Sequence, residues 1–203
     1  MNALTVGDFT LSDDPFGLMR AWMDEAKASE PRDPNAIALA TVDPDGLPDV
    51  RMVLLKDFDA RGFVFYTNDE SAKGEQLAGT PQAALVLYWK SLNRQIRARG
   101  PVTAVSDAES DAYFNSRHPR SRVGAIASAQ SRPLESREAL EDRVTALEKQ
   151  FGDGPIPRPA NWHGFRIAPQ QMEFWQDKPN RLHDRVVFHF DAAGRWTRQR
   201  LNP

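Results

Sequence analysis

Two arginines flank a histidine near the C-terminus, in the segment Arg181-Leu182-His183-Asp184-Arg185. Side chains two residues apart in an extended strand point to the same face, so Arg181, His183 and Arg185 are predicted to form one polar row. Three cationic or proton-handling groups on one face would suit an anionic ligand. A strand edge in contact with water would explain the same pattern, because arginines are common there. The triplet alone does not separate these two interpretations.

A second candidate segment carries a cation at each end of an apolar run, Arg51-Met52-Val53-Leu54-Leu55-Lys56. In a strand, alternation places Arg51, Val53 and Leu55 on one face, and Met52, Leu54 and Lys56 on the other. Cations at both ends of an apolar stretch could hold a flat ring with an anionic tail. A strand whose charged ends simply reach water remains the simpler alternative.

A third candidate is a strand that ends at Tyr66 and Thr67 and leads into a helix carrying Lys73. Helix N-termini offer free N–H groups and a partial positive charge, which suit a phosphate. No glycine-rich nucleotide motif accompanies the segment, so a triphosphate or dinucleotide is not indicated. Ser71 before the helix could equally be only a cap.

A fourth candidate combines Tyr113 and Arg117, which are predicted neighbours on one helix, with Ser121 just past the expected helix end at His118-Pro119. A phenol, a guanidinium and a hydroxyl would form a good phosphate clamp, although an exposed helix end explains them as well. Two polar pairs, Arg94-Gln95 and Gln130-Ser131, and the tryptophan Trp175 complete the set of candidates.

The composition limits the class of protein. The 203 residues are 40% hydrophobic and 27% charged with a net charge of −2, so no global field would recruit nucleic acid or an acidic membrane, and any anion site must be local. The chain has no cysteine, and its four histidines show no metal-binding spacing, so no metal is expected. No apolar stretch approaches the roughly 20 residues of a membrane span, and the N-terminus lacks a signal-peptide pattern, so we expect a cytoplasmic protein.

The elements that must position these residues are mostly strands. Apolar patterns and turn residues predict a helix from about residue 14 to 26, further helices over 71–78, 107–117 and 136–151, and strands over 36–42, 50–56, 63–68, 83–89, 95–105, 163–167, 171–175, 186–190 and 196–201. Gly100-Pro101 predicts a bend. Meandering strands favour a closed barrel with helices outside it, formed by a single domain of residues 14–203 after a flexible N-terminal segment of residues 1–13.

Together these segments resemble the pyridoxamine/pyridoxine 5′-phosphate oxidase family from about residue 14 to the end of the chain. A single motif would be weak support, but eight in order across nearly the whole chain are specific. The motifs are Arg51-x-Val-Leu-Leu-Lys56, Phe65-Tyr-Thr-Asn68, Arg94-Gln95, Tyr113-Phe-x-Ser-Arg117, Gln130-Ser131, Trp162-x-Gly-Phe-Arg166, Glu173-Phe-Trp-Gln176 and Arg181-Leu-His-Asp-Arg185.

The resemblance implies a mainly β fold with peripheral helices (α+β), an FMN-binding split β-barrel, and a homodimer that holds FMN in clefts between its two chains. It implies oxidation of pyridoxamine 5′-phosphate and pyridoxine 5′-phosphate to pyridoxal 5′-phosphate in vitamin B6 metabolism. Dioxygen would be the acceptor, hydrogen peroxide a product, and ammonia would be released from the amine.

By position, the resemblance also implies the site residues. The FMN contacts would be Arg51, Met52, Val53, Leu54, Leu55, Lys56, Tyr66, Thr67, Lys73, Gln95, Gln130, Ser131, Trp175 and Arg185. The substrate contacts would be Lys56, Tyr113, Arg117, Ser121, Arg181, Leu182 and His183. Arg181 and His183 would be catalytic over the pyridine ring, with Arg181 positioning it and His183 handling a proton or a hydrogen bond; a general base is not established by the sequence.

Three positions depart from the family pattern. Ala72-Lys73 replaces the common Arg-Lys, so one contact to the FMN phosphate is absent or supplied by another basic residue. Ile126 replaces an aromatic residue before the Gln-Ser pair, and Asn202 precedes the final proline where Ala, Ser or Tyr is common. None of the three removes a substrate contact.

Two other functions share the barrel. A split-barrel protein could bind FMN or pyridoxal phosphate without turnover, and a flavin reductase could use a nicotinamide donor. Neither alternative would need the second group of phosphate-binding residues, such as Tyr113, Arg117 and Ser121, beside a flavin site.

Overall fold

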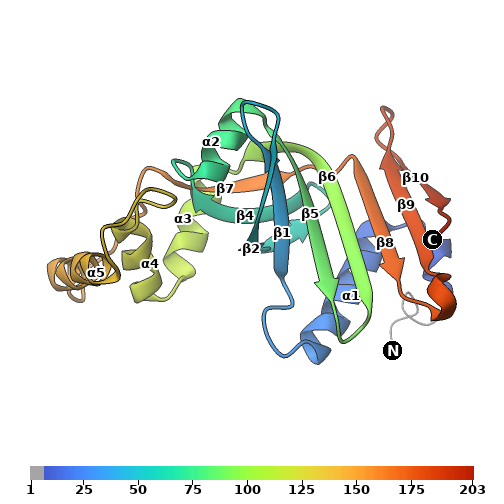
Figure 1. Ribbon diagram of the computed structural model, residues 1–203, viewed down its shortest axis with the longest axis horizontal. Coiled ribbons are helices and arrows are strands. Elements are labelled where there is room, and N and C mark those ends of the chain that lie inside the picture. The colour runs from blue at the N-terminus through green and yellow to red at the C-terminus, as the bar shows by residue number, and fades with distance from the viewer. Residues whose placement is uncertain (1–6) are drawn as a thin grey trace.

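The computed structural model describes residues 7–203 (Figure 1). The first long helix, α1 (Pro15–Ser29), begins at Asp14, whose carboxylate accepts hydrogen bonds from the N–H groups of Phe16 and Gly17. This cap satisfies two of the backbone donors that a helix start leaves unpaired. Its apolar stripe, which includes Leu18, Met19 and Trp22, is almost fully buried.

Within residues 7–203, ten strands form one antiparallel sheet. Strands β10-β9-β8-β6-β5-β1-β2 lie side by side in this order, β7 pairs with β6 and β4, and β4 pairs with β3. Their bounds are β1 Ala36–Val42, β2 Pro48–Leu54, β3 Asp57–Asp59, β4 Gly62–Asn68, β5 Gln82–Trp89, β6 Arg94–Ala104, β7 Trp162–Ile167, β8 Gln171–Gln176, β9 Asp184–Phe190 and β10 Trp196–Arg200. The nine predicted strands are confirmed; the short β3 was not predicted.

Strand β6 bends in the middle and changes its partner there. Residues 94–99 pair with β8, whereas Val102 to Ala104 pair with β7. Gly100 lies at the change, where a Cβ atom would stand 2.0 Å from the carbonyl oxygen of Ala168. The predicted bend at Gly100-Pro101 is therefore confirmed, and glycine is needed because another backbone approaches it closely.

The sheet curls into an open barrel. The closed barrel predicted from the strand pattern is therefore wrong, and the split barrel implied by the family resemblance is confirmed. The Lys56 N–H donates to the Val64 oxygen at 2.8 Å, but no ladder joins β2 to β4 within residues 7–203. The core lies between the concave sheet and α1. There Trp22 packs edge to face on Phe174, with ring centroids 5.4 Å apart.

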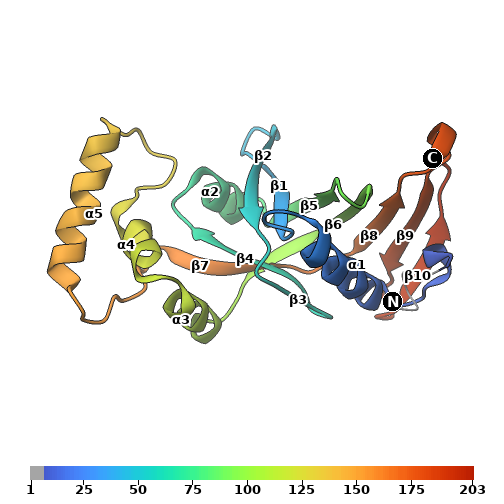
Figure 2. The same cartoon turned by 90° about the horizontal axis from the view of Figure 1, so that it is seen from below.

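Residues 7–203 form four further α-helices, of which the first lies beside β1 and the other three lie at the end of the molecule opposite β8, β9 and β10 (Figures 1 and 2). They are α2 (Ala72–Gly79), α3 (Asp107–Ser116), α4 (Pro119–Ala127) and α5 (Arg137–Phe151). The helix α4 was not predicted, although Pro119 occupies its first turn, where proline is favoured. A second small core of Phe114, Val123, Ile156 and Trp162 holds this end together.

The N-terminal segment was expected to be flexible up to residue 13; residues 1–6 lie outside the described residues. Phe9–Leu11 form a 3-10 helix, and Thr10 is buried. Arg198 donates to the Asp13 carboxylate and to the Thr10 carbonyl, so this part of the chain packs on β10. Among residues 7–203, no helix is long and apolar enough to cross a membrane.

Candidate active site

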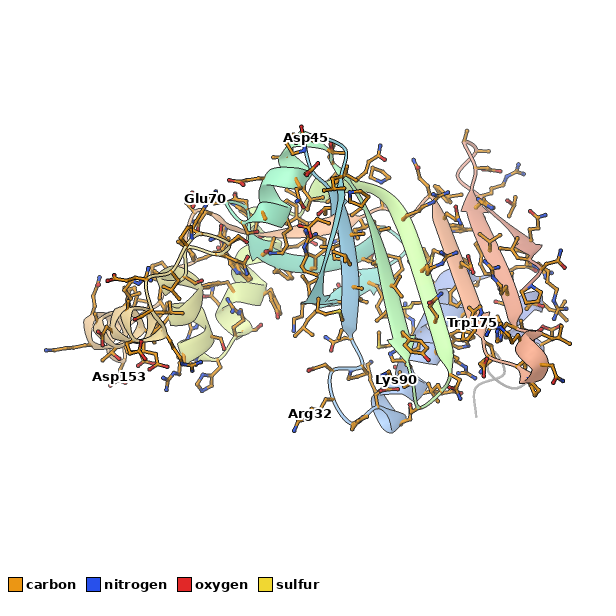
Figure 3. All side chains as sticks on the ribbon, in the orientation of Figure 1. Arg32, Asp45, Glu70, Lys90, Asp153 and Trp175 are labelled. Atoms are coloured by element: carbon orange, nitrogen blue, oxygen red, sulfur yellow. The ribbon has the colours of Figure 1, made fainter. Side chains whose placement is uncertain are left out.

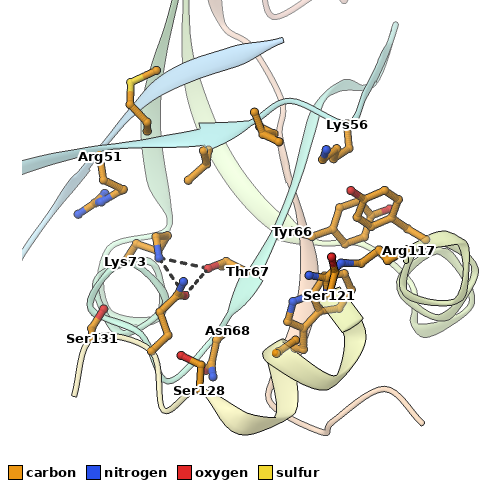
Figure 4. A pocket seen from close by; sticks show the side chains of 18 of the residues that line it. Arg51, Lys56, Tyr66, Thr67, Asn68, Lys73, Arg117, Ser121, Ser128 and Ser131 are labelled. Carbon is orange, nitrogen blue, oxygen red and sulfur yellow. Dashed lines mark hydrogen bonds between the residues drawn. The ribbon is translucent and has the colours of Figure 1, made fainter. Parts of the chain in front are cut away.

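A cleft of about 1000 Å³ opens between β2, β4 and the helices α2 to α4 (Figure 4). It gathers most of the predicted site residues from segments that are far apart in the sequence. They are Arg51, Met52, Val53, Leu54, Lys56, Tyr66, Thr67, Lys73, Tyr113, Arg117, Ser121, Gln130 and Ser131. The predicted alternation of β2 is observed, because Arg51 and Val53 are half-buried while Met52 and Leu54 are exposed.

Lys73 is the buried cation at one end of the cleft, in the first turn of α2. Its ammonium lies 3.2 Å from Thr67 Oγ1 and 3.1 Å from Gln130 Oε1 (Figure 4). It also lies 3.2 Å from Ser71 Oγ, so all three partners are neutral groups. Burial, and secondly the positive charge of Arg51, lower the pKa of Lys73. A buried cation that has only neutral hydrogen-bond partners suits an anionic ligand.

Arg51 is held at the same end by protein groups. Its guanidinium donates to Thr41 Oγ1 at 2.5 Å and to the Asp49 carboxylate at 2.5 Å. Gln76 of α2 bridges the pair, since its Oε1 accepts from Arg51 and its Nε2 donates to Asp49. The arginine is therefore fixed in place at the wall of the cleft.

Arg117 is the second cation, at the other end of the cleft. It is the C-cap of α3, in extended conformation, rather than part of the helix as the predicted spacing assumed. Its guanidinium lies over the ring of Trp162, 5.0 Å from the centroid. The Nη1 atom is buried without a hydrogen-bond partner among the described residues. An unpaired buried donor is costly, so a ligand oxygen is the natural partner here.

Aromatic rings form the wall beside Arg117. Tyr66 stacks on Tyr113 with centroids 4.1 Å apart and on Trp162 at 5.2 Å. The Lys56 ammonium lies 5.7 Å from the centroid of Tyr113. Ser121 lies in the first turn of α4, with its N–H bonded to the His118 carbonyl. The unpredicted helix therefore presents this hydroxyl to the cleft.

Eight further lining residues were not predicted as site residues: Asp49, Asn68, Ala72, His118, Gly124, Ala125, Ser128 and Trp162. Asn68 and Trp162 belong to the quoted motifs and pair with each other across β4 and β7, so the motifs did contain a signal for them. Ser128 follows directly after α4 and could not be placed without that helix.

Six of the predicted residues lie elsewhere in the chain, around the ends of β8 and β9: Gln95, Trp175, Arg181, Leu182, His183 and Arg185. Trp175 lies far from α3 and α4 (Figure 3). Leu55 does not line the cleft either; its side chain is buried in the core. Within one chain, the residues proposed for one site thus form two separate groups.

The polar row predicted from Arg181, His183 and Arg185 is wrong. Pro179–Arg181 form a 3-10 turn in which Asn180 and Arg181 have positive φ values of 59° and 61°, and β9 begins only at Asp184. His183 instead packs on Trp175 with ring centroids 4.7 Å apart. Its Nδ1 accepts from the Lys178 N–H and lies 2.9 Å from the Asp177 carboxylate.

Arg185 is tied to a buried carboxylate. Its Nε and Nη2 lie 2.9 and 2.8 Å from Oε1 of Glu173, which is only 3% exposed, and Arg97 pairs with the other carboxylate oxygen. Nη1 of Arg185 donates to the Asn202 carbonyl at 3.0 Å. The end of the chain therefore belongs to this second group.

Family models match almost the whole chain. Residues 23–151 match the model described as pyridoxamine 5′-phosphate oxidase, and residues 162–203 match the pyridoxine 5′-phosphate oxidase C-terminal dimerisation region. The chain belongs to the pyridoxamine 5′-phosphate oxidase family. The predicted resemblance to this oxidase family is confirmed.

Two relatives named pyridoxine/pyridoxamine 5′-phosphate oxidase are each 60% identical to this member of the oxidase family. The protein from Azorhizobium caulinodans aligns over 100% of this chain and 96% of its own length, and the one from Gluconobacter oxydans over 95% and 96%. The structure of PhzG from Burkholderia lata in complex with tetrahydrophenazine-1-carboxylic acid is 31% identical, with a TM-score of 0.91 over 100% of this chain and 99% of that one. An FMN-binding protein from Nostoc punctiforme shares the fold, with a TM-score of 0.76 at 20% identity over 95% of this chain and 99% of that one.

Proposed function

We propose that the protein oxidises pyridoxamine 5′-phosphate and pyridoxine 5′-phosphate to pyridoxal 5′-phosphate, with FMN as cofactor and dioxygen as acceptor. The observation that carries the proposal is the pair of cations at opposite ends of one cleft. Lys73 has only neutral hydrogen-bond partners, and Arg117 has a buried nitrogen with none among the described residues. Two such groups suit two phosphates, one of the flavin and one of the substrate.

The Lys73 end fits the FMN phosphate. Besides the ammonium, Thr67, Gln130 and Ser131 supply polar groups there, and Arg51 adds a fixed positive charge. Ala72 also lines the cleft, so the basic side chain common in the family at this position is absent. When bound, FMN would accept a hydride from C4′ of the substrate and deliver electrons to dioxygen, which gives hydrogen peroxide.

The Arg117 end fits the substrate phosphate. The phosphate oxygens would be bound by Arg117, Ser121, Tyr113 and Lys56. The cation–π contact with Trp162 holds the Arg117 guanidinium in place in the absence of an anion. By fixing the phosphate, these residues would determine where C4′ of the substrate lies.

Arg181, His183, Trp175 and Arg185 would reach this cleft from a second chain. We propose a homodimer in which the cleft of each protomer is completed by the β8–β9 end of its partner. Arg181 would position the pyridine ring, and His183 would donate or accept a hydrogen bond there. The separation of the two groups within one chain, and the match of residues 162–203 to a dimerisation region, support this arrangement.

The proposal is tested by anaerobic titration of the purified protein loaded with FMN. Pyridoxamine 5′-phosphate should bleach the flavin absorption, and admission of air should restore it with release of hydrogen peroxide. A protein that binds FMN but is not bleached by either B6 phosphate would be a binding protein rather than an oxidase. Bleaching by a nicotinamide donor alone would indicate a flavin reductase.

A further inference from the structure

The buried carboxylate of Glu173 is not among the proposed contacts to FMN or substrate. It does bind Arg185, which is one of the proposed FMN contacts. It lies two residues before Trp175 on β8, hence on the same face of the sheet, and opposite Arg97 of β6. Arg185 lies opposite Trp175 on β9. Glu173 therefore stands between two arginines from the two neighbouring strands.

The contacts determine how Arg185 is held. Glu173 Oε1 binds its Nε and Nη2, and the Asn202 carbonyl binds its Nη1. A guanidinium has five N–H donors. Within the described residues these contacts leave one donor on each terminal nitrogen of Arg185 for a ligand. The side chain is still 25% exposed, so those donors can be reached.

We propose that Glu173 is a positioning residue for FMN, which acts by holding the Arg185 guanidinium in its binding orientation. A long arginine side chain loses much rotamer freedom when it binds, and a rigid partner removes that loss beforehand. Arg97, whose side chain is 47% exposed, compensates the second carboxylate oxygen so that the buried charge is tolerated. This inference rests on the proposed function, in which Arg185 contacts FMN.

The test measures the dissociation constant of FMN from the quenching of its fluorescence on addition to apoprotein. Glu173→Gln keeps the size of the side chain but removes its charge. It should raise the dissociation constant of FMN about tenfold, an effect of the size found when one of two interacting residues is changed. In an Arg185→Gln background the same change should alter the constant by less than about twofold. At saturating FMN, Glu173→Gln should leave the KM for pyridoxamine 5′-phosphate within about twofold of the parent, which a general loss of structure would not.

Arg99→Gln is the matched control, because Arg99 lies on the same face of β6 and binds the neutral Gln171 of β8. It should leave FMN affinity unchanged. The inference is overturned if Glu173→Gln binds FMN as tightly as the parent, if it weakens binding equally with and without Arg185, or if Arg185→Gln itself has no effect. Failure of the parent protein to bind FMN at all would instead overturn the proposed function.

Discussion

At the scale of single residues, the cleft is marked by two cations, Lys73 and Arg117, for which the described residues supply no carboxylate partner. Burial of an ammonium costs free energy, and this burial, together with the positive charge of Arg51, lowers the pKa of Lys73. An anion beside Lys73 would reverse the shift, because it stabilises the protonated form. Arg117 cannot lose its proton at accessible pH, so it needs a partner at every pH.

The pKa shift predicts how FMN binding depends on pH. The pKa of Lys73 lies below the ordinary value of 10.5, so the ammonium that binds phosphate is lost at a lower pH than in a free lysine. FMN affinity should therefore fall as pH rises through this lowered pKa, while apoprotein stability rises there because the unfolded chain binds the extra proton. Fluorescence titrations between pH 7 and 10 check this, and Lys73→Arg should flatten the profile.

Arg117→Ala should raise the KM for pyridoxamine 5′-phosphate by about 10- to 100-fold, since a hydrogen bond to a charged group contributes roughly 1.5–3 kcal/mol. FMN affinity should stay within about twofold, because Lys73 and its partners are untouched. Steady-state kinetics beside an FMN titration separate the two effects. Arg120→Ala removes an exposed arginine of α4 and serves as control. If Arg117→Ala weakened FMN binding as much as it raised the KM, the division of the cleft into an FMN end and a substrate end would be wrong.

At the scale of elements, the bend of β6 is what turns a flat meander into an open barrel. One half of the strand pairs with β8 and the other with β7, so β6 belongs to both walls. The bend also separates the cleft side, where β4 and β7 lie, from the β8–β9 end.

Gly100→Ala should destabilise the fold by about 2–3 kcal/mol or more, because its Cβ would overlap the Ala168 carbonyl, which is backbone and cannot turn away. That cost corresponds to a fall in Tm of roughly 4–12 °C for a chain of this size. Differential scanning calorimetry measures it. Gly79→Ala is the control, since nothing lies within 4 Å of its Cβ position, and it should leave Tm unchanged or slightly raised.

At the scale of the whole molecule, the sheet exposes an apolar face that one chain does not cover. Val50, Met52 and Tyr88 are 63%, 65% and 51% exposed on neighbouring parts of this face. A contiguous group of large apolar side chains that are more than half exposed indicates an interaction surface. This face is therefore a candidate surface for the second copy in the homodimer proposed above.

This arrangement predicts complementation between two inactive variants. Arg117→Ala damages the cleft, and Arg181→Ala damages the group that the partner contributes. At a pyridoxamine 5′-phosphate concentration well below the parent KM, each homodimer should be nearly inactive, whereas a mixed dimer contains one intact site built from the undamaged half of each chain. Co-expression with two different tags should restore about a quarter of the parent activity in an unselected mixture, and about half in purified mixed dimers. No restoration would mean that each chain completes its own site.

Much of the fold followed from the sequence because its causes are local. Alternating apolar residues predicted the nine longer strands, Asp14 and Pro15 marked the start of α1, and Gly100-Pro101 marked the bend of β6. The order of the motifs was enough to identify the family. Helix α4 was missed because its first turn, Pro119-Arg120-Ser121, carries no apolar stripe that distinguishes it from a loop.

Only the tertiary structure decided what depends on contacts between distant segments. Arg181 has a positive φ, whereas a β-strand requires a negative φ. Arg181, His183 and Arg185 therefore do not form the polar row that the sequence predicted. The register of β6 and β8 places Glu173 opposite Arg97, and the packing of β9 on β8 brings Arg185 within ion-pair distance of the same carboxylate. No spacing along the chain reveals these two ion pairs. The sequence by itself determined the set of candidate site residues. The folded sheet determined that one chain holds this set in two separate groups, because the two halves of β6 pair with different strands.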